Sequence, residues 1–151
     1  MDYKQIAYTS EEPTIEFKPG IWKTTLAYIG ESMLCHFQMK KGSTLALHEH
    51  EAVQNGFILS GRIEFFKEDG SSFVVGAGDG YVFGSYELHG SKALEDVDFI
   101  ECFNPMRPEY VVTASSSPSM NSKTTPHNDT NDANETKEAK KPKKSNKQHT
   151  N

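Results

Sequence analysis

The sequence predicts an all-β protein of the antiparallel sandwich or barrel type, followed by a polar tail. Three observations support this fold class. Short segments rich in Val, Ile, Phe, Tyr and Thr follow one another along the chain, and turn signals separate them at intervals of about 8–12 residues. No segment shows a helical period of apolar residues. Regular short strands of this kind are typical of sandwiches and barrels.

Nine strands are expected along the chain. A turn at Gly30-Glu31 separates the first two, and a break at Lys40-Lys41-Gly42 precedes the third. Ser60-Gly61 and Asp69-Gly70 are typical of hairpins, and the glycine-rich run 76–80 breaks the pattern again. A short closing segment is expected at 105–110. The expected strands cover residues 22–29, 33–39, 44–48, 53–59, 62–66, 72–75, 81–83, 88–93 and 97–103.

Composition and charge divide the chain near residue 112. Residues 113–151 contain one strong hydrophobe, Met120, and carry seven Lys against four acidic residues. Residues 1–112 carry 17 Asp and Glu against nine Lys and Arg. We therefore expect one domain over residues 1–112, with its core at about 22–110, and a disordered, low-complexity basic tail over 113–151.

The same composition excludes several classes of partner. An acidic domain lacks the basic footprint that phosphate binding needs, so we expect no nucleic-acid binding by the core. No apolar run approaches the ~18 residues of a membrane span, and residues 1–10 lack the apolar run of a signal peptide. The two cysteines, Cys35 and Cys102, are too few for a disulfide framework. These features predict a cytoplasmic protein without membrane contact.

Three of the six histidines have the spacing of metal ligands. His48 and His50 are two residues apart, so on a strand both imidazoles point to the same face. His89 lies on a later strand that can return beside them, and Gln54 follows His50 by four residues. Imidazole nitrogens suit Zn, Cu, Fe and Ni. His36 has no such partner, and we interpret it as structural.

Glycines frame these residues in a pattern that resembles the two cupin motifs. The first motif reads Gly42-x5-His48-x-His50-x3-Gln54-x6-Gly61, and the second runs from Gly78 through Gly84 to His89. The family usually has Pro, Gly and Asn at the positions of Gly84, Tyr86 and Ala93. The resemblance implies a single antiparallel jelly-roll barrel that binds one divalent metal ion (Zn, Ni, Mn or Fe). It implies as ligands His48, His50, Gln54 and His89.

Gln54 is chemically informative, because many cupins carry Glu at this position. A neutral amide among three neutral imidazoles leaves the full positive charge of the metal in the site. Such a metal is a stronger Lewis acid and a better host for an anionic substrate.

On the last strand, alternation places Phe99, Glu101 and Phe103 on one face. If that face is the inner one, Glu101 is a carboxylate inside the barrel, which is costly unless it is used or paired. It is then a candidate general acid or base. The alternative is an outward, solvated Glu101.

A closer resemblance rests on residues 57–61 and on the final acidic-x-Phe-x-Pro-x-Arg segment at 101–107. Both are similar to the small pectin-degradation cupins of the KdgF type, which linearise 4,5-unsaturated uronates. This resemblance implies a catalytic role for Glu101 and substrate-binding roles for Phe103 and Arg107. Those proteins have Asp where this chain has Glu101, whose carboxylate extends one methylene further.

The expected function is isomerase or lyase chemistry on an anionic small molecule, namely a sugar acid such as an unsaturated uronate. The metal would polarise a carbonyl or hydroxyl group while Glu101 moves a proton. Two alternatives stay open: an Fe(II)-dependent dioxygenase and a non-catalytic cupin that binds a small ligand. A homodimer is also expected, since small cupins commonly pair through sheet edges and exposed edges need cover.

Overall fold

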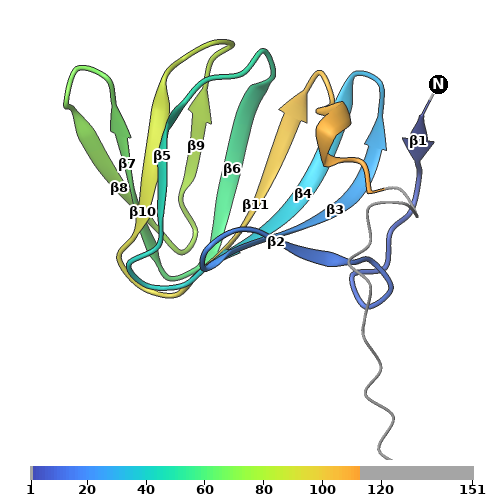
Figure 1. The fold of residues 1–151 in the computed structure, drawn as a ribbon, viewed down its shortest axis with the longest axis horizontal. Coiled ribbons are helices and arrows are strands. Elements are labelled where there is room, and N and C mark those ends of the chain that lie inside the picture. The colour runs from blue at the N-terminus through green and yellow to red at the C-terminus, as the bar shows by residue number, and fades with distance from the viewer. Residues whose placement is uncertain (1, 113–151) are drawn as a thin grey trace, which may run out of the picture. The chain divides into compact units, whose positions relative to one another are not determined.

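The computed structural model describes residues 2–112, which are almost entirely β (Figure 1). They form eleven strands and one short 3-10 helix, η1, at Pro108–Tyr110. The strands are β1 Tyr3–Lys4, β2 Thr14–Lys18, β3 Ile21–Ile29, β4 Ser32–Met39, β5 Thr44–His48, β6 Val53–Ser60, β7 Arg62–Lys67, β8 Ser72–Gly76, β9 Gly80–Phe83, β10 His89–Ala93 and β11 Val97–Asn104.

The strands form two antiparallel sheets. The larger sheet has the order β1-β3-β4-β11-β6-β9, and β2 also pairs with β3. The smaller sheet has the order β5-β10-β7-β8. Strands far apart in sequence lie side by side in both, as β11 between β4 and β6 shows (Figure 1). This arrangement confirms the predicted all-β fold class.

The core lies between the two sheets and follows from the period-two alternation of each strand. In β11 the buried residues are Val97, Phe99, Glu101 and Phe103, and the residues between them are half-buried or exposed. Aromatic side chains join the sheets: Phe65 of β7 lies 4.4 Å from Tyr81 of β9, between ring centroids. The inner face of the larger sheet therefore carries both apolar residues and the carboxylate of Glu101.

The structure corrects two expectations. Strands β1 and β2 were not predicted, although Ile15 and Phe17 of β2 alternate with exposed residues as a strand requires. Ser60-Gly61 is not a hairpin, because β6 and β7 belong to different sheets. Gly61 has φ +80°, and a Cβ there would lie 2.1 Å from the backbone oxygen of Asp96. Only glycine fits this tight crossing between the sheets.

Other expectations are confirmed or lie outside what the structure describes. The turn at Gly30-Glu31 and the hairpin at Asp69-Gly70 are present. Within residues 2–112 no helix has the length and hydropathy of a membrane span. The predicted tail, 113–151, lies outside the described residues, so the domain boundary stays a prediction. Cytoplasmic location and the homodimer also stay predictions.

Candidate metal centre

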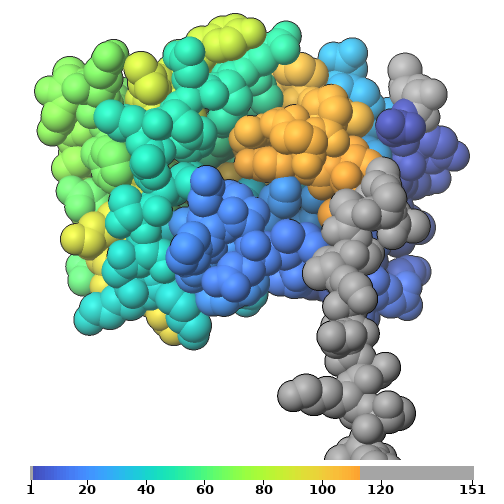
Figure 2. Space-filling view, in the orientation of Figure 1, coloured from blue at the N-terminus to red at the C-terminus, as the bar shows by residue number. Residues whose placement is uncertain are grey.

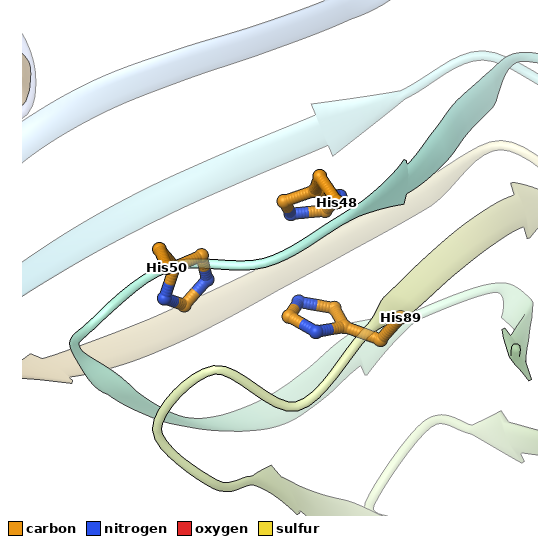
Figure 3. Close-up of side chains that lie close together, drawn as sticks. All are labelled: His48, His50 and His89. Atoms are coloured by element: carbon orange, nitrogen blue, oxygen red, sulfur yellow. The ribbon is translucent and has the colours of Figure 1, made fainter.

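Two strands of the smaller sheet bring the three predicted histidines together. His48 is the last residue of β5 and His89 the first residue of β10, and the two face each other in the antiparallel register. His50 follows two residues after His48. One ligand nitrogen from each ring lies within 4.8 Å of the others (Figure 3). Three such nitrogens can hold a metal ion.

Hydrogen bonds determine which nitrogen each imidazole offers. In all three rings Nδ1 contacts a backbone carbonyl two residues away along the chain. The pairs are His48 with Ala46 at 2.9 Å, His50 with Ala52 at 2.8 Å and His89 with Glu87 at 2.6 Å. Since a carbonyl only accepts, each Nδ1 donates and each Nε2 keeps its lone pair. The Nε2 of His89 is buried without a hydrogen-bond partner among the described residues, which a metal ion would supply.

The surroundings favour the neutral form of His50 and His89 and fix both rings. Burial, together with the two neighbouring imidazoles, lowers the pKa of His89 to about 4. The pKa of His50 is also lowered, mainly by burial and to a smaller extent by the positive charge of Arg107. Phe83 stacks on His89 with ring centroids 4.2 Å apart, and Phe103 packs edge-on against His50 at 5.9 Å. Neutral imidazole is the form that binds a metal.

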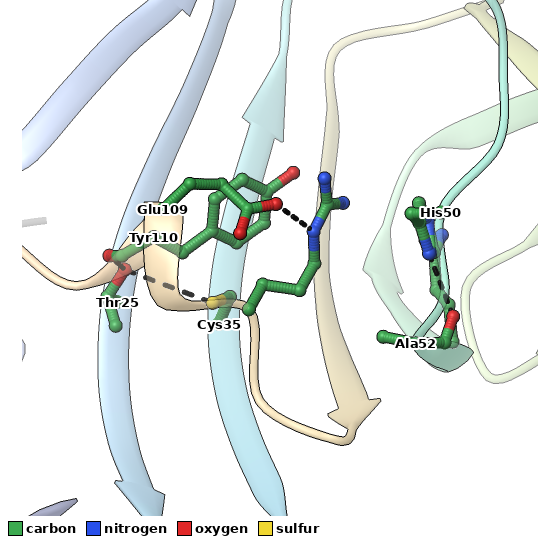
Figure 4. A network of polar contacts seen from close by, with 8 residues as sticks. Thr25, Cys35, His50, Ala52, Glu109 and Tyr110 are labelled. Atoms are coloured by element: carbon green, nitrogen blue, oxygen red, sulfur yellow. Dashed lines mark hydrogen bonds and ion pairs between the residues drawn. The ribbon is translucent and has the colours of Figure 1, made fainter. Parts of the chain in front are cut away.

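Gln54, the predicted fourth ligand, lies on β6 with 5% of its surface exposed. Its Oε1 lies 3.0 Å from Nε2 of His50, and its Nε2 donates to Oε1 of Glu101 at 2.6 Å. The Nε2 of His50 is an acceptor because Nδ1 donates to Ala52 (Figure 4). Two acceptors therefore face each other, an arrangement that fits a cation between them. These residues thus suit a divalent metal.

Glu101 points into the interior from the middle of β11 and is 5% exposed. Its Oε1 accepts two hydrogen bonds, from Gln54 and from the hydroxyl of Tyr81 at 2.5 Å. Within residues 2–112, Oε2 makes no hydrogen bond. Burial raises the pKa of Glu101 to about 7, against the opposing effect of the Tyr81 hydrogen bond and of Arg107. Tyr81 is not among the predicted site residues, because no local sequence pattern links β9 to β11.

His48 and His89 border a small cavity, and His48 also borders a larger groove beside it. The cavity, about 30 Å³, is lined by His48, Gln54, His89, Glu101 and other residues of both sheets. The groove, about 510 Å³, is formed by residues of β2, β5 and the C-terminal segment. His48, Arg107 and Tyr110 line both hollows. These shared residues form the junction of the two hollows. Arg107 and Tyr110 belong to the C-terminal segment that contains η1, whose orange atoms lie at the surface of the molecule (Figure 2).

Of the two predicted substrate-binding residues, Arg107 lines the cavity and the groove, whereas Phe103 lines neither. The Nε of Arg107 donates to Glu109 at 2.8 Å, and its guanidinium carbon lies 4.2 Å from the ring centroid of Tyr110. This puts a positive charge at the junction. Phe103 is 1% exposed, packs against His50 and is not among the residues that line the cavity. Its predicted contact with substrate stays a prediction.

Comparisons with known proteins agree with this architecture. Residues 35–100 match the family model of the cupin domain. No curated protein matches the chain in sequence. An RmlC-like cupin from Shewanella frigidimarina is 21% identical with a TM-score of 0.68, and the match covers 74% of this chain and 100% of that one. KdgF from Halomonas sp. is 26% identical with a TM-score of 0.66, covering 72% and 99%.

A larger enzyme shares the fold over part of its length. Oxalate decarboxylase from Bacillus subtilis is 20% identical with a TM-score of 0.57, and the match covers 70% of this chain but 30% of that one. The family model, the architecture and the histidine cluster agree. This chain therefore contains a cupin domain, and that domain resembles the KdgF-type cupins.

Proposed function

We propose that this protein is a metal-dependent isomerase or lyase that acts on a small sugar acid, with an unsaturated uronate as the substrate. The observation that carries the proposal is the position of Glu101. This buried carboxylate lines the same small cavity as His48 and His89, and its Oε2 is free of hydrogen bonds within residues 2–112. A carboxylate beside a metal site, with one oxygen free, suits proton transfer to or from a bound substrate.

The ligands we propose for the metal are His48, His50, His89 and Gln54. A divalent ion bound there supplies Lewis-acid polarisation of a substrate hydroxyl or carbonyl group. Because all four ligands are neutral, they leave the charge of the ion uncompensated, which favours an anionic substrate. The KdgF-type resemblance supports this assignment, with Glu101 in the place of the usual Asp.

The remaining steps follow from residues of the chain. Arg107, at the junction of groove and cavity, binds the substrate carboxylate through its guanidinium. Ring opening of a 4,5-unsaturated uronate removes the proton of the anomeric hydroxyl, breaks the ring C–O bond and later adds a proton to C4. Glu101 Oε2 accepts the first proton and returns one to the product. The reaction is an isomerisation, so it needs neither an oxidant nor a second substrate.

The metal assignment is tested by replacing one histidine. His50→Ala is expected to remove most of the bound metal, measured by elemental analysis of the purified protein. His36→Ala is the matched control, because His36 pairs with Asp98 on the opposite face of the larger sheet. Equal metal content in His50→Ala and the wild type would show that the assignment is wrong.

The activity is tested with unsaturated uronate released from pectin or alginate by a lyase. Loss of the ultraviolet absorbance of the conjugated double bond should accelerate with the metal-loaded wild type. Glu101→Gln should lower kcat about 100-fold or more, since proton transfer by a positioned side chain contributes about 10²–10⁴-fold. Glu95→Gln, which alters an exposed pair with Arg62, is the control.

Three outcomes would contradict the isomerase proposal. Turnover by the wild type no faster than in buffer rejects this substrate class. Oxygen uptake with the Fe(II)-loaded protein on a candidate substrate favours the dioxygenase. Binding without turnover that Glu101→Gln leaves unchanged favours a non-catalytic binding cupin.

A further inference from the structure

Tyr81 reaches Glu101 across an intervening strand. In the larger sheet Gly56 of β6 pairs with Tyr81 of β9 on one side and with Glu101 of β11 on the other. All three lie in one row across the sheet. The ring of Tyr81 passes over Gly56, where an added Cβ would lie 2.3 Å from the nearest ring atom. Any larger residue at position 56 would push the tyrosine away from the carboxylate.

The hydroxyl of Tyr81 and the amide of Gln54 hold the same carboxylate oxygen. They donate to Oε1 of Glu101 at 2.5 and 2.6 Å. Tyr81 is 9% exposed, and both Gln54 and Glu101 are 5% exposed. Little water competes for these bonds, and buried hydrogen bonds to a carboxylate are strong ones.

This arrangement determines which end of Gln54 faces the histidines. An amide side chain has one donor end and one acceptor end. Since the NH₂ group is bound to Glu101, the carbonyl oxygen faces Nε2 of His50, 3.0 Å away. With the amide turned over, NH₂ would face the histidines, and an amide NH₂ does not ligate a metal.

We propose that Tyr81 is a positioning residue that, through Glu101, directs the carbonyl oxygen of Gln54 toward the metal. This inference rests on the metal site of the proposed function. It adds to that site Tyr81, a residue that is not itself a proposed metal ligand. Tyr81 holds Oε1 of Glu101 in place, Oε1 holds the NH₂ group of Gln54, and Oε2 stays free for the substrate. Gly56 is the sheet position that permits this contact.

The first test removes only the hydroxyl. Tyr81→Phe is expected to weaken Zn²⁺ binding about 10-fold, because partners behind metal ligands typically contribute about 10–100-fold. The visible spectrum of the Co²⁺-loaded protein should also change, since the Gln54 ligand is no longer held. Tyr28→Phe is the matched control: it removes a tyrosine hydroxyl from β3 that makes no hydrogen bond within residues 2–112. Wild-type Zn²⁺ affinity and Co²⁺ spectrum in Tyr81→Phe would overturn the proposal.

The second test asks whether Tyr81 acts through Gln54. In a Gln54→Ala background there is no amide to orient, so adding Tyr81→Phe should leave Zn²⁺ affinity unchanged. A 10-fold loss in both backgrounds would mean a general structural effect and would also overturn the proposal. Gly56→Ala, which displaces the ring instead of removing the hydroxyl, should weaken Zn²⁺ binding in the same direction as Tyr81→Phe.

These measurements need no substrate, so they separate the inference from the proposed function. If the wild type binds Zn²⁺ but does not turn over unsaturated uronate, the isomerase assignment fails while the Tyr81 inference is still decided by metal affinity. If turnover is present and Tyr81→Phe binds Zn²⁺ like the wild type, the inference alone fails.

Discussion

Two ionisable residues, Glu101 and Lys23, lie on the inner face of the larger sheet in neighbouring rows. Their side chains make different kinds of contact. Glu101 lies in a row with Tyr81 and Cys35, and its carboxylate accepts two hydrogen bonds. Lys23 lies in a row with Phe37 and Phe99. It forms no ion pair within residues 2–112, and its Nζ lies 3.3 Å from the ring centroid of Tyr110.

The difference shows how a buried charge is tolerated. Glu101 has hydrogen-bond donors that replace water, whereas Lys23, only 6% exposed, has mainly the face of an aromatic ring. Burial shifts the pKa of both groups toward the neutral form, to about 7 for Glu101 and to about 8 for Lys23. Cys35 in the same interior is also affected, since burial raises the pKa of its thiol to about 12 and keeps it un-ionised. The two rows therefore differ in their contacts: Glu101 has two hydrogen-bond donors at one carboxylate oxygen, whereas Lys23 has only aromatic contacts within residues 2–112.

The largest expected effect comes from removing the acceptor in the Glu101 row. Glu101→Leu leaves the hydroxyl of Tyr81 and the amide of Gln54 buried without their acceptor. We expect a loss of about 3 kcal/mol in the free energy of unfolding, since each unsatisfied buried donor costs about 1–3 kcal/mol. Urea unfolding of the metal-free protein measures it. Stability equal to the wild type would show that these hydrogen bonds contribute nothing net.

Replacing Lys23 should raise the free energy of unfolding, whereas Glu101→Leu lowers it. Lys23→Met keeps most of the side-chain volume and removes a buried charge without an ion-pair partner. We expect a gain of about 2 kcal/mol in the free energy of unfolding at neutral pH, as the lowered pKa implies. The shift of the urea midpoint checks this. A loss of stability would mean that the contact with Tyr110 outweighs the desolvation of Lys23.

The gain from Lys23→Met should shrink as pH rises. Between the folded pKa of about 8 and the unfolded value of 10.5, Lys23 is neutral in the folded state and charged in the unfolded state. The unfolded chain then binds more protons, so the stability of the wild type rises with pH relative to the variant. Cys35, Arg107 and Glu109 face Lys23 and are common to both proteins. The difference should narrow by about 2 kcal/mol over this window, and a constant difference would contradict the lowered pKa.

The smallest effect is expected outside both rows. Removing residues 113–151 should leave the thermal midpoint almost unchanged, because the apolar residues of the chain are concentrated in residues 1–112. It should also leave the opposite effects of Glu101→Leu and Lys23→Met unchanged. A fall of many degrees would show that these residues contribute to the stability of the domain.

Much of the fold and of the candidate site was predictable from local patterns. Alternation and turn residues predicted nine of the eleven strands, and the spacing of His48 and His50 placed both rings on one side. The pattern of β11 left open whether Glu101 faces inward, because alternation defines two faces without saying which is buried. Lys23 shares the face of Ile21 and Thr25, a signal for burial that its charge obscured.

The sequence by itself determined nine of the eleven strands and the candidate ligands His48, His50, Gln54 and His89. Strand periodicity and the spacing within each motif depend on residues close together in the chain. Only the tertiary structure decided that His89 faces His48, that Tyr81 crosses Gly56 to reach Glu101, and that Tyr110 covers Lys23. These contacts join residues that are far apart in sequence. Their geometry depends on sheet order and register, which no local pattern contains.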